Sequence, residues 1–212
     1  MSLREEKKAA TRRAISEATA ALVLEEGTAA ATVARVSERA GVSARTFHNY
    51  FADIDEALEE FLKKVFATIA EQIAALPEQL SAAEALEAII TDALEEDGFE
   101  LYSASTLVLL SDRARAESAA PPAEETMREI AQPLVAAVRG RTPGATAFDA
   151  EVLLNAYGTP GATAFDAEVL LNAYGIAGAT AVKYYLMQPE PRTPDDGRAL
   201  VRRAFEVLRD MR

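Results

Sequence analysis

The sequence predicts an all-α protein. Apolar residues recur at spacings of three and four along almost the whole chain, and no run shows the alternation of β-branched residues that is typical of strands. Half of the 212 residues are hydrophobic and 26% are charged, which allows a sizeable core. We therefore expect a globular protein built only from helices.

Capping residues and helix breakers give the expected helix boundaries. Gly27 can end the first helix, and Asp53 with Glu56, like Ser81 with Glu84, has the spacing of a capping box. Pro77 limits the helix that Asp53 begins. The expected helices span residues 4–26, two short segments between 32 and 51, 53–76, 81–97, 99–118, 123–139 with Pro133 inside, 164–188 and 194–212.

A perfect tandem copy interrupts the second half of the chain. Residues 142–158 read TPGATAFDAEVLLNAYG, and residues 159–175 repeat them without a change. Repeat architectures diverge and need about three units or more to bury a continuous core, so a recent duplication or an error in the recorded sequence explains the pair better. If both copies are real, each gives a short helix ending at Asn-Ala-Tyr-Gly, and the second copy continues into the long helix.

Composition excludes several classes of function. The chain has no cysteine, which removes disulfides, thiolate ligands and thiol nucleophiles, and its single histidine cannot build a triad or a histidine-rich metal site. No glycine loop of the phosphate-binding type is present. We therefore expect no enzyme activity, no metal and no cofactor. No signal peptide and no run of ~18–20 apolar residues is found, so a cytoplasmic protein without membrane contact is expected.

Charge is unevenly distributed along the chain. Residues 1–50 hold eight Lys and Arg against six Asp and Glu, whereas the remainder holds fourteen against twenty-eight. The net charges are therefore +2 and −14. This asymmetry could orient the N-terminal end toward a polyanion, although a value of +2 is also ordinary for a protein surface.

Residues 32–51, TVARVSERAGVSARTFHNYF, contain a helical pattern that stops at a glycine and restarts at once. Thr32 can cap the first helix, Gly41 can take the positive φ of a tight turn, and Ser43 can cap the second helix. Apolar Val33, Val36, Ala40, Val42, Phe47 and Phe51 fall on the inner side. The pattern predicts a helix-turn-helix.

The second of these helices leaves polar side chains for a DNA groove. Arg45 can read a guanine edge with two hydrogen bonds, and Thr46 can reach a phosphate, a base edge or a thymine methyl group. His48 and Tyr50 are better placed for phosphate oxygens. The predicted DNA-binding residues are Thr32, Ser43, Ala44, Arg45, Thr46, His48, Asn49 and Tyr50. The alternative is a tight helical corner without any nucleic-acid role.

At these residues the sequence resembles the TetR family of bacterial regulators. The matching elements are a Thr-Val helix start at residues 32–33, an Ala-Gly-Val-Ser turn at 40–43 and an aromatic-rich recognition helix at 47–51. Two positions depart from the family pattern: His48 replaces a usual Tyr, and Ile54 stands where a phosphate-binding Lys is frequent. We expect phosphate affinity to depend more on Arg4, Lys7, Lys8, Arg12 and Arg13.

The resemblance implies two domains and a homodimer. Residues 1–52 would form the helix-turn-helix DNA-binding domain and residues 53–212 a ligand-binding and dimerisation domain. Two recognition helices held about one turn of DNA apart, ~34 Å, would read a palindromic double-stranded operator. The last two helices are the expected interface, through Val182, Tyr185, Leu186, Leu200, Ala204 and Leu208. These stripes could instead pack on their own subunit.

The resemblance also implies a repressor that leaves its operator when a small-molecule effector binds. Phe66, Phe99, Tyr102, Leu109 and Leu134 are candidates for a mostly apolar pocket, although ordinary core packing explains them equally well. Nothing in the sequence identifies the effector. The alternative function is a helical small-molecule-binding protein that never contacts DNA.

Overall fold

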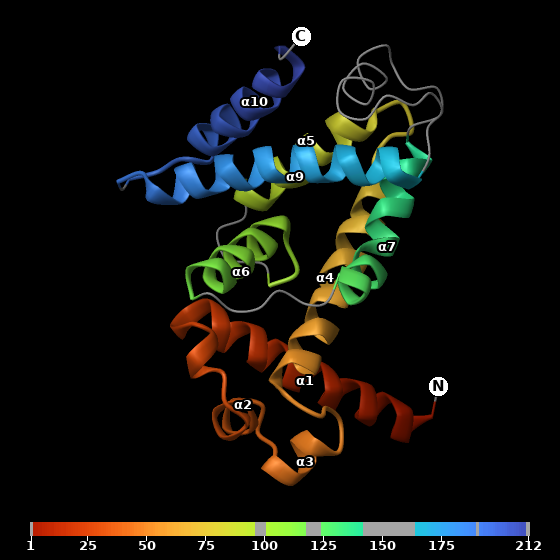
Figure 1. The fold of residues 1–212 in the computed structure, drawn as a ribbon, viewed down its shortest axis with the longest axis vertical. Coiled ribbons are helices and arrows are strands. Elements are labelled where there is room, and N and C mark those ends of the chain that lie inside the picture. The colour runs from red at the N-terminus through yellow and green to blue at the C-terminus, as the bar shows by residue number, and fades with distance from the viewer. Residues whose placement is uncertain (1, 96–100, 118–123, 142–163, 190, 211–212) are drawn as a thin grey trace. The chain divides into compact units, whose positions relative to one another are not determined.

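The computed structural model describes residues 2–95, 101–117, 124–141, 164–189 and 191–210. Within these ranges every regular element is a helix, in the order labelled in Figure 1. The all-α fold predicted from the apolar spacing is confirmed. None of the helices in the described ranges is long and apolar enough to cross a membrane.

The helices of the N-terminal quarter begin and end close to the predicted positions. Helix α1 spans Leu3–Glu26, and Gly27 follows with φ +96° and donates its N–H to the Val23 carbonyl at 2.9 Å. A 3₁₀ turn, η1, covers Thr28–Ala30 before α2 (Val33–Arg39) and α3 (Ala44–His48). We call α1, η1, α2 and α3 together the head.

Helix α4 spans Ile54–Ala75, so it stops before Pro77 as predicted. Asp53 Oδ1 accepts from the Glu56 N–H at 2.9 Å, which confirms the cap. The reciprocal hydrogen bond differs, because Glu56 accepts from the N–H of Ala52 at 2.6 Å. Only the reciprocal hydrogen bond is therefore shifted by one residue from the predicted box.

Packing divides the chain into two compact units. The first comprises residues 1–65 and 109–130 and contains the whole head. Its core is formed by fully or almost fully buried side chains of several helices: Ile15, Leu22, Val23, Val36, Phe47, Phe51, Phe61, Val65 and Ile130. These contacts group the start of α4 with the head, whereas the expected DNA-binding domain ends at residue 52; that sequence boundary stays a prediction.

The second unit comprises residues 66–108 and 131–212. It contains α5 (Ala82–Glu95), α9 (Ala164–Met187) and α10 (Pro194–Asp210), and α10 packs against both α9 and α5. The capping box of α5 is confirmed, because Ser81 Oγ accepts from the Glu84 N–H at 3.3 Å and Glu84 accepts from the Ser81 N–H at 2.8 Å. Its predicted end near Asp97 lies outside the described residues.

Aromatic and aliphatic packing joins α9 to α10. The rings of Tyr174 and Phe205 lie 4.8 Å apart between centroids, and both side chains are buried. Gly178 allows α9 to approach α5 closely, since an added Cβ would overlap Ile90. The predicted stripe of α10 at residues 200, 204 and 208 is only half-buried, whereas Val201 and Phe205 are 0% exposed. The side of α10 facing its own chain is therefore rotated by one residue from the predicted stripe.

Helix α6 spans Ala104–Ala116 and starts later than the predicted residue 99. The buried Ser103 accepts from the Thr106 N–H at 3.3 Å, so its hydroxyl caps the helix at this point. The apolar periodicity that suggested an earlier start continues through Leu101 and Tyr102, but these residues form a turn. The start of α6 is therefore set by the Ser103 cap and not by the apolar periodicity.

Helix α7 spans Glu124–Gly140 and contains Pro133, close to the predicted 123–139. Arg141 directly after it donates to the carbonyl groups of Pro77 at 2.6 Å and Leu76 at 2.6 Å, and also to that of Ile73. A guanidinium group thus satisfies the free carbonyls at the end of α4. This cap ties the end of α7 to the end of α4 inside the second unit.

The two tandem copies have different outcomes. Residues 142–158, the first copy, lie outside the described residues. In the second copy the predicted helix end at residues 172–175 is wrong, because α9 continues through Gly175 to Met187. Burial of Tyr174 and the close contact at Gly178 stabilise the helix beyond the glycine. The prediction that the second copy enters the long helix is confirmed.

Candidate nucleic-acid interface

The turn between α2 and α3 has the geometry that its residues predict. Thr32 Oγ1 accepts from the Arg35 N–H at 3.4 Å, and Ser43 Oγ accepts from the Thr46 N–H at 3.0 Å, so both helices carry side-chain caps. Gly41 has φ +66°, and nothing lies within 4 Å of an added Cβ. The backbone conformation alone, and not lack of space, therefore favours glycine here.

One face of α3 anchors the helix and the other is open to solvent. Phe47 is 0% exposed and Phe51 is 2% exposed, and their rings lie 6.0 Å apart. Around them the predicted reading residues divide by exposure: Ala44, Arg45, His48 and Asn49 are exposed, and Thr46 and Tyr50 are half-buried. Both capping residues, Thr32 and Ser43, are also exposed. Seven of the eight predicted DNA-binding residues thus lie on α3 or directly beside it in the chain, whereas Thr32 caps α2.

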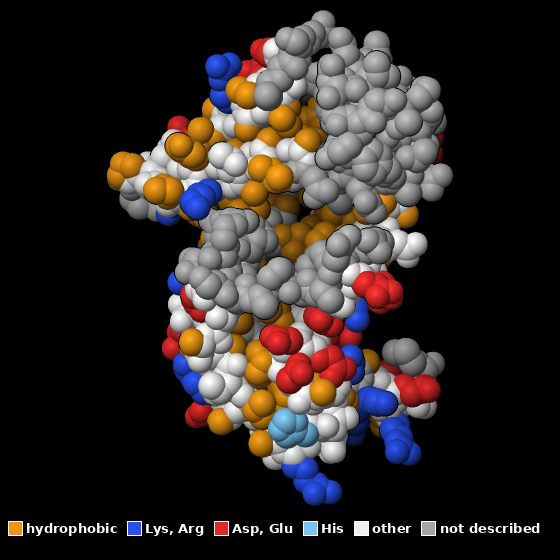
Figure 2. Space-filling view, viewed as in Figure 1, with side chains coloured by type: hydrophobic (Ala, Val, Ile, Leu, Met, Phe, Trp, Pro, Cys, Tyr) orange, Lys and Arg blue, Asp and Glu red, His pale blue; other side chains and the backbone are white. Residues whose placement is uncertain are grey.

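The polar groups on α3 differ in how strongly they are already engaged. Within the described residues Arg45 makes no ion pair, so its guanidinium is available to a ligand. The Thr46 hydroxyl lies 2.8 Å from that of Ser43, so part of its hydrogen-bonding capacity is used locally. His48 packs edge-on against Phe47, with ring centroids 5.4 Å apart. Figure 2 shows this single histidine in pale blue at the lower end, with basic side chains protruding below it.

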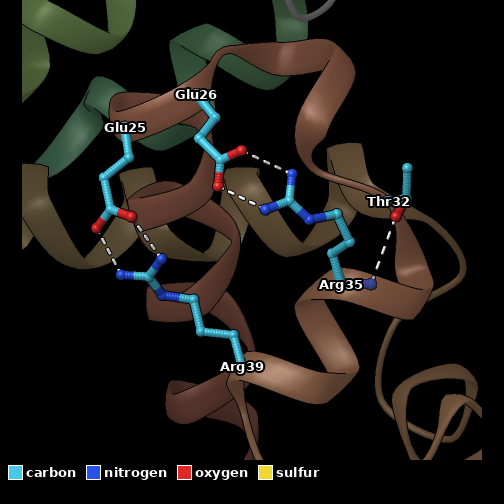
Figure 3. A network of polar contacts seen from close by, with 5 residues as sticks. All are labelled: Glu25, Glu26, Thr32, Arg35 and Arg39. Carbon is cyan, nitrogen blue, oxygen red and sulfur yellow. Dashed lines mark hydrogen bonds and ion pairs between the residues drawn. The ribbon is translucent and has the colours of Figure 1, made fainter.

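Two ion pairs fix α2 against the end of α1 (Figure 3). Arg35 donates to Glu26 at 2.9 and 2.5 Å, and Arg39 donates to Glu25 at 2.6 and 2.5 Å. Each pair is bidentate, which fixes orientation as well as distance. The hydrogen bonds from arginine lower the pKa of both glutamates. The two arginines of α2 are therefore committed to positioning the helix-turn-helix.

Arg12 is committed in the same way, which corrects its expected role at phosphate. Its guanidinium donates to the Tyr50 carbonyl at 3.0 Å and to Glu60 at 2.9 Å, and lies 4.4 Å from the centroid of the Phe51 ring. The hydrogen bond from Arg12 lowers the pKa of Glu60. Arg12 thus links α1, the end of the recognition helix and α4. The partners of Arg12 lie 38 and 48 residues away in the sequence, so no local pattern predicted these contacts.

The remaining cations of α1 gather in one open concavity beside the recognition helix. Its volume is about 660 Å³, and it is lined by Leu3, Arg4, Lys7, Lys8, Thr11 and Tyr50. Within the described residues the three cations of this basic groove make no ion pair. Arg13, the fifth expected phosphate ligand, lies 3.9 Å from Glu17 instead. The structure therefore brings together three of the five cations.

The first turn of α4 has the opposite charge. Ile54 is half-buried where the family pattern often has lysine, and Asp53 and Asp55 beside it are exposed. Figure 2 shows acidic side chains grouped over α1 and α4, above the histidine.

The residues expected to line a pocket are divided between the units. Phe66 and Tyr102 are half-buried and Leu134 is 4% exposed, all in the second unit, whereas Leu109 belongs to the first. Phe99 lies outside the described residues. Of the expected dimer contacts, Val182 is 0% exposed within its own chain and so offers no surface to a partner. The other five, Tyr185, Leu186, Leu200, Ala204 and Leu208, are half-buried.

A short capped helix presented on a three-helix head defines the helix-turn-helix class of DNA-binding domain. Comparison with known proteins agrees. The sequence profile of the family described as "Bacterial regulatory proteins, tetR family" matches residues 15–61. Residues 15–61 therefore resemble the TetR family of bacterial regulatory proteins, and the resemblance seen in the sequence is confirmed. No curated protein sequence matches the chain.

Solved structures extend the likeness to nearly the whole chain. A putative TetR-family transcriptional regulator from Rhodococcus sp. has a TM-score of 0.60 and 19% identity, covering 94% of this chain and 99% of that one. A transcriptional regulator from Rhodococcus sp. Rha1 has the same TM-score and identity, with 93% and 95% covered. FadR from Bacillus subtilis, solved in complex with stearoyl-CoA, has a TM-score of 0.57 and 18% identity, with 93% and 97% covered. The fold is that of TetR-family regulators.

Proposed function

We propose that this chain is a DNA-binding transcriptional repressor that reads its operator with α3. The observation that carries the proposal is the pairing of a fully buried Phe47 with an exposed Arg45 that makes no ion pair within the described residues. A rigidly anchored helix can insert an arginine into the major groove without first breaking an internal contact. Asn49 and His48 share the exposed surface and would extend the contact.

The basic groove supports a phosphate contact beside the recognition helix. Arg4, Lys7 and Lys8 present three positive charges next to Tyr50, and each phosphate neutralised by a cation releases counterions. The exposed Asp53 and Asp55 at the first turn of α4 would repel the backbone. We infer that the DNA backbone runs along α1 and not along the start of α4.

We infer that the exposed apolar surface of α9 and α10 binds a second copy of the chain. Within the described residues, every exposed large hydrophobic side chain except Leu3 lies on α9 or α10: Ile176, Tyr184, Met187 and Val207, which are 45–74% exposed. The three on α9 recur at helical spacing and form one face. Two helices from each copy would build a four-helix bundle across a two-fold axis.

The expected interface residues change accordingly. Val182 is excluded by its burial, and Ile176, Tyr184, Met187 and Val207 replace it as the strongest candidates. The Ile176→Asp, Met187→Asp double variant should sediment as a monomer at micromolar concentration, where the unmodified protein should sediment as a dimer. Leu3→Asp, which changes an exposed hydrophobic residue outside this face, should stay dimeric. A double variant that remains dimeric would exclude this face.

The proposed effector is a small molecule held in the second unit. FadR from Bacillus subtilis was solved with stearoyl-CoA, which supports ligand binding by a body of this fold without selecting a ligand for this chain. Phe66, Tyr102 and Leu134 stay the predicted lining. An effector releases DNA only if it binds more tightly to the conformation in which the two heads are wrongly spaced.

Replacing Arg45 by alanine tests the proposal. Loss of a bidentate base contact costs about 1–3 kcal/mol, so operator affinity should fall roughly ten- to hundredfold with an unchanged melting temperature. The measurement is fluorescence anisotropy with fragments of the promoter region that precedes the chain's own gene. Lys64→Ala, which removes an exposed cation from α4, is the matched control and should change affinity little. Equal operator binding by both variants would contradict base reading by Arg45, and absence of binding even by the unmodified protein would favour the alternative of a small-molecule carrier.

A further inference from the structure

One carboxylate from the end of α6 closes the turn between α1 and α2. Glu117 directly follows α6 and is 89 residues from Thr28 in the sequence. It accepts a hydrogen bond from the Thr28 N–H at 2.7 Å and another from the Thr28 hydroxyl. These two hydrogen bonds, the hydroxyl first, lower the pKa of Glu117, so the carboxylate is ionised at neutral pH.

The position of this carboxylate is that of a helix cap supplied from a distant part of the chain. Thr28 begins η1, and no side chain of the preceding residue caps the turn. The first N–H groups of a helical turn lack partners inside the turn and need an acceptor. Glu117 provides that acceptor, so removing its carboxylate would leave the turn uncapped.

Gly27 makes the approach of Glu117 possible. An added Cβ at Gly27 would overlap the carboxylate of Glu117. Gly27 also has φ +96°, a conformation that residues with a side chain rarely adopt. The positive φ therefore favours glycine at this position, and the absence of a side chain leaves the space that the end of the Glu117 side chain occupies.

In the sequence, the capped turn lies between the two glutamates that hold α2 through ion pairs and the residue that caps the start of α2. Glu25 and Glu26, which precede the turn, hold Arg39 and Arg35 (Figure 3). Thr32, which follows it, donates to the Ala30 carbonyl at 2.9 Å and caps α2. A displacement of the turn would therefore move both attachments of α2, and α3 with it.

The other end of α6 is attached to the second unit. Ser105, in the first turn of α6, donates to the Ala93 carbonyl of α5 at 2.9 Å.

We propose that Glu117 is a positioning residue that caps η1 and so holds the helix-turn-helix in its DNA-reading orientation. The proposal rests on the proposed DNA-binding function and names a contact which that function needs. Without the Glu117 carboxylate, η1 loses its cap and the chain that leads into α2 is held less firmly. The affinity for operator DNA then falls without any change at α3 itself.

Hydrogen exchange tests the contact without DNA. In Glu117→Ala, amides of residues 28–39 should exchange about tenfold faster than in the unmodified protein, while those of α10 should be unchanged. Glu129→Ala removes an exposed carboxylate from α7 and is the matched control, with no change expected in either segment. Unchanged exchange at 28–39, or faster exchange everywhere, would overturn the proposal.

Operator binding tests the consequence. Glu117→Ala should weaken binding to the promoter fragment about fivefold or more, and Thr28→Val, which removes one of the two donors, should weaken it less. Because both changes remove the same contact, the double variant should bind as Glu117→Ala does. Additive losses would overturn the proposal. If the unmodified protein binds no promoter DNA, the proposed function fails, and the exchange experiment still decides whether Glu117 holds the turn.

Discussion

The helix-turn-helix and the α9–α10 pair are held together by different forces. Helix α2 has seven residues and α3 has five, and between them they bury only Val36, Ser37 and Phe47. Their orientation is fixed by caps and bidentate ion pairs at the surface. The much longer α9 and α10 pack through buried aromatic and aliphatic side chains such as Tyr174 and Phe205. Short helices that bury little need polar attachments, whereas long helices can rely on one apolar face.

The largest effect should come from the apolar pair. Phe205→Ala removes a side chain that is 0% exposed and should destabilise the fold by about 3–5 kcal/mol. Val207→Ala, two residues away on the same helix but 45% exposed, should cost far less in a monomer. Urea unfolding followed by circular dichroism measures both. Equal losses would mean that α10 is not held by its inner face.

A smaller loss should follow at the turn. Gly41→Ala forces a residue with a side chain into φ +66° and should cost about 1–2 kcal/mol, although space is free around it. Gly140→Ala is the control, because Gly140 ends α7 and also has free space, but its φ is not positive. Alanine there should be neutral or stabilise by up to ~1 kcal/mol. A neutral Gly41→Ala variant would contradict the backbone argument.

One substitution in the head should stabilise it. Within the described residues, the Ser37 hydroxyl is buried without a hydrogen-bond partner, so Ser37→Ala should raise the free energy of unfolding by about 1 kcal/mol. Ser16 is equally buried, but its hydroxyl donates to the Arg13 carbonyl at 2.9 Å. Ser16→Ala should therefore bring no gain. A shift of the thermal midpoint in the same direction for both variants would refute the distinction.

Acid should weaken the polar attachments before the apolar pair. The pKa values of Glu25 and Glu26 are lowered in the folded protein, by Arg39 and Arg35, from an ordinary value of 4.5. Their stabilising contribution is therefore complete above about pH 4.5 and is lost as the pH falls below it. The Glu25→Gln, Glu26→Gln variant should lose less stability than the unmodified protein between pH 5 and pH 3. Because both pairs are exposed, 1 M salt should reduce this difference.

Local signals in the sequence predicted the head well. Capping residues, the glycine turn and the inward aromatic residues act within a few positions of the chain, so Thr32, Gly41, Ser43 and Phe47 lie as expected. The contacts of Arg12 with Tyr50 and Glu60 join residues 38 and 48 positions apart. Local spacing in the sequence does not indicate contacts between residues this far apart. The sequence analysis therefore grouped Arg12 with the expected phosphate ligands.

In the second unit the helices were predictable but their faces were not. Periodicity marks a helix as amphipathic, yet α10 has apolar residues on two adjacent stripes, and only tertiary packing decides which one its own chain buries. The chain itself buries Val201 and Phe205, whereas Leu200 and Ala204, which are expected at the dimer interface, are half-buried. On α9, likewise, the periodicity does not show that Val182 is buried and Tyr184 is exposed.

The unbroken path of α9 through the second tandem copy has a genetic consequence. Residues 142–158 and 159–175 are identical, so deleting either block yields the same shorter polypeptide. In that polypeptide the residues of α9 from Ala164 to Gly175 would still precede Ile176 in the same order. Loss of one block by strand slippage during replication would therefore leave the amino-acid sequence of this helix unchanged.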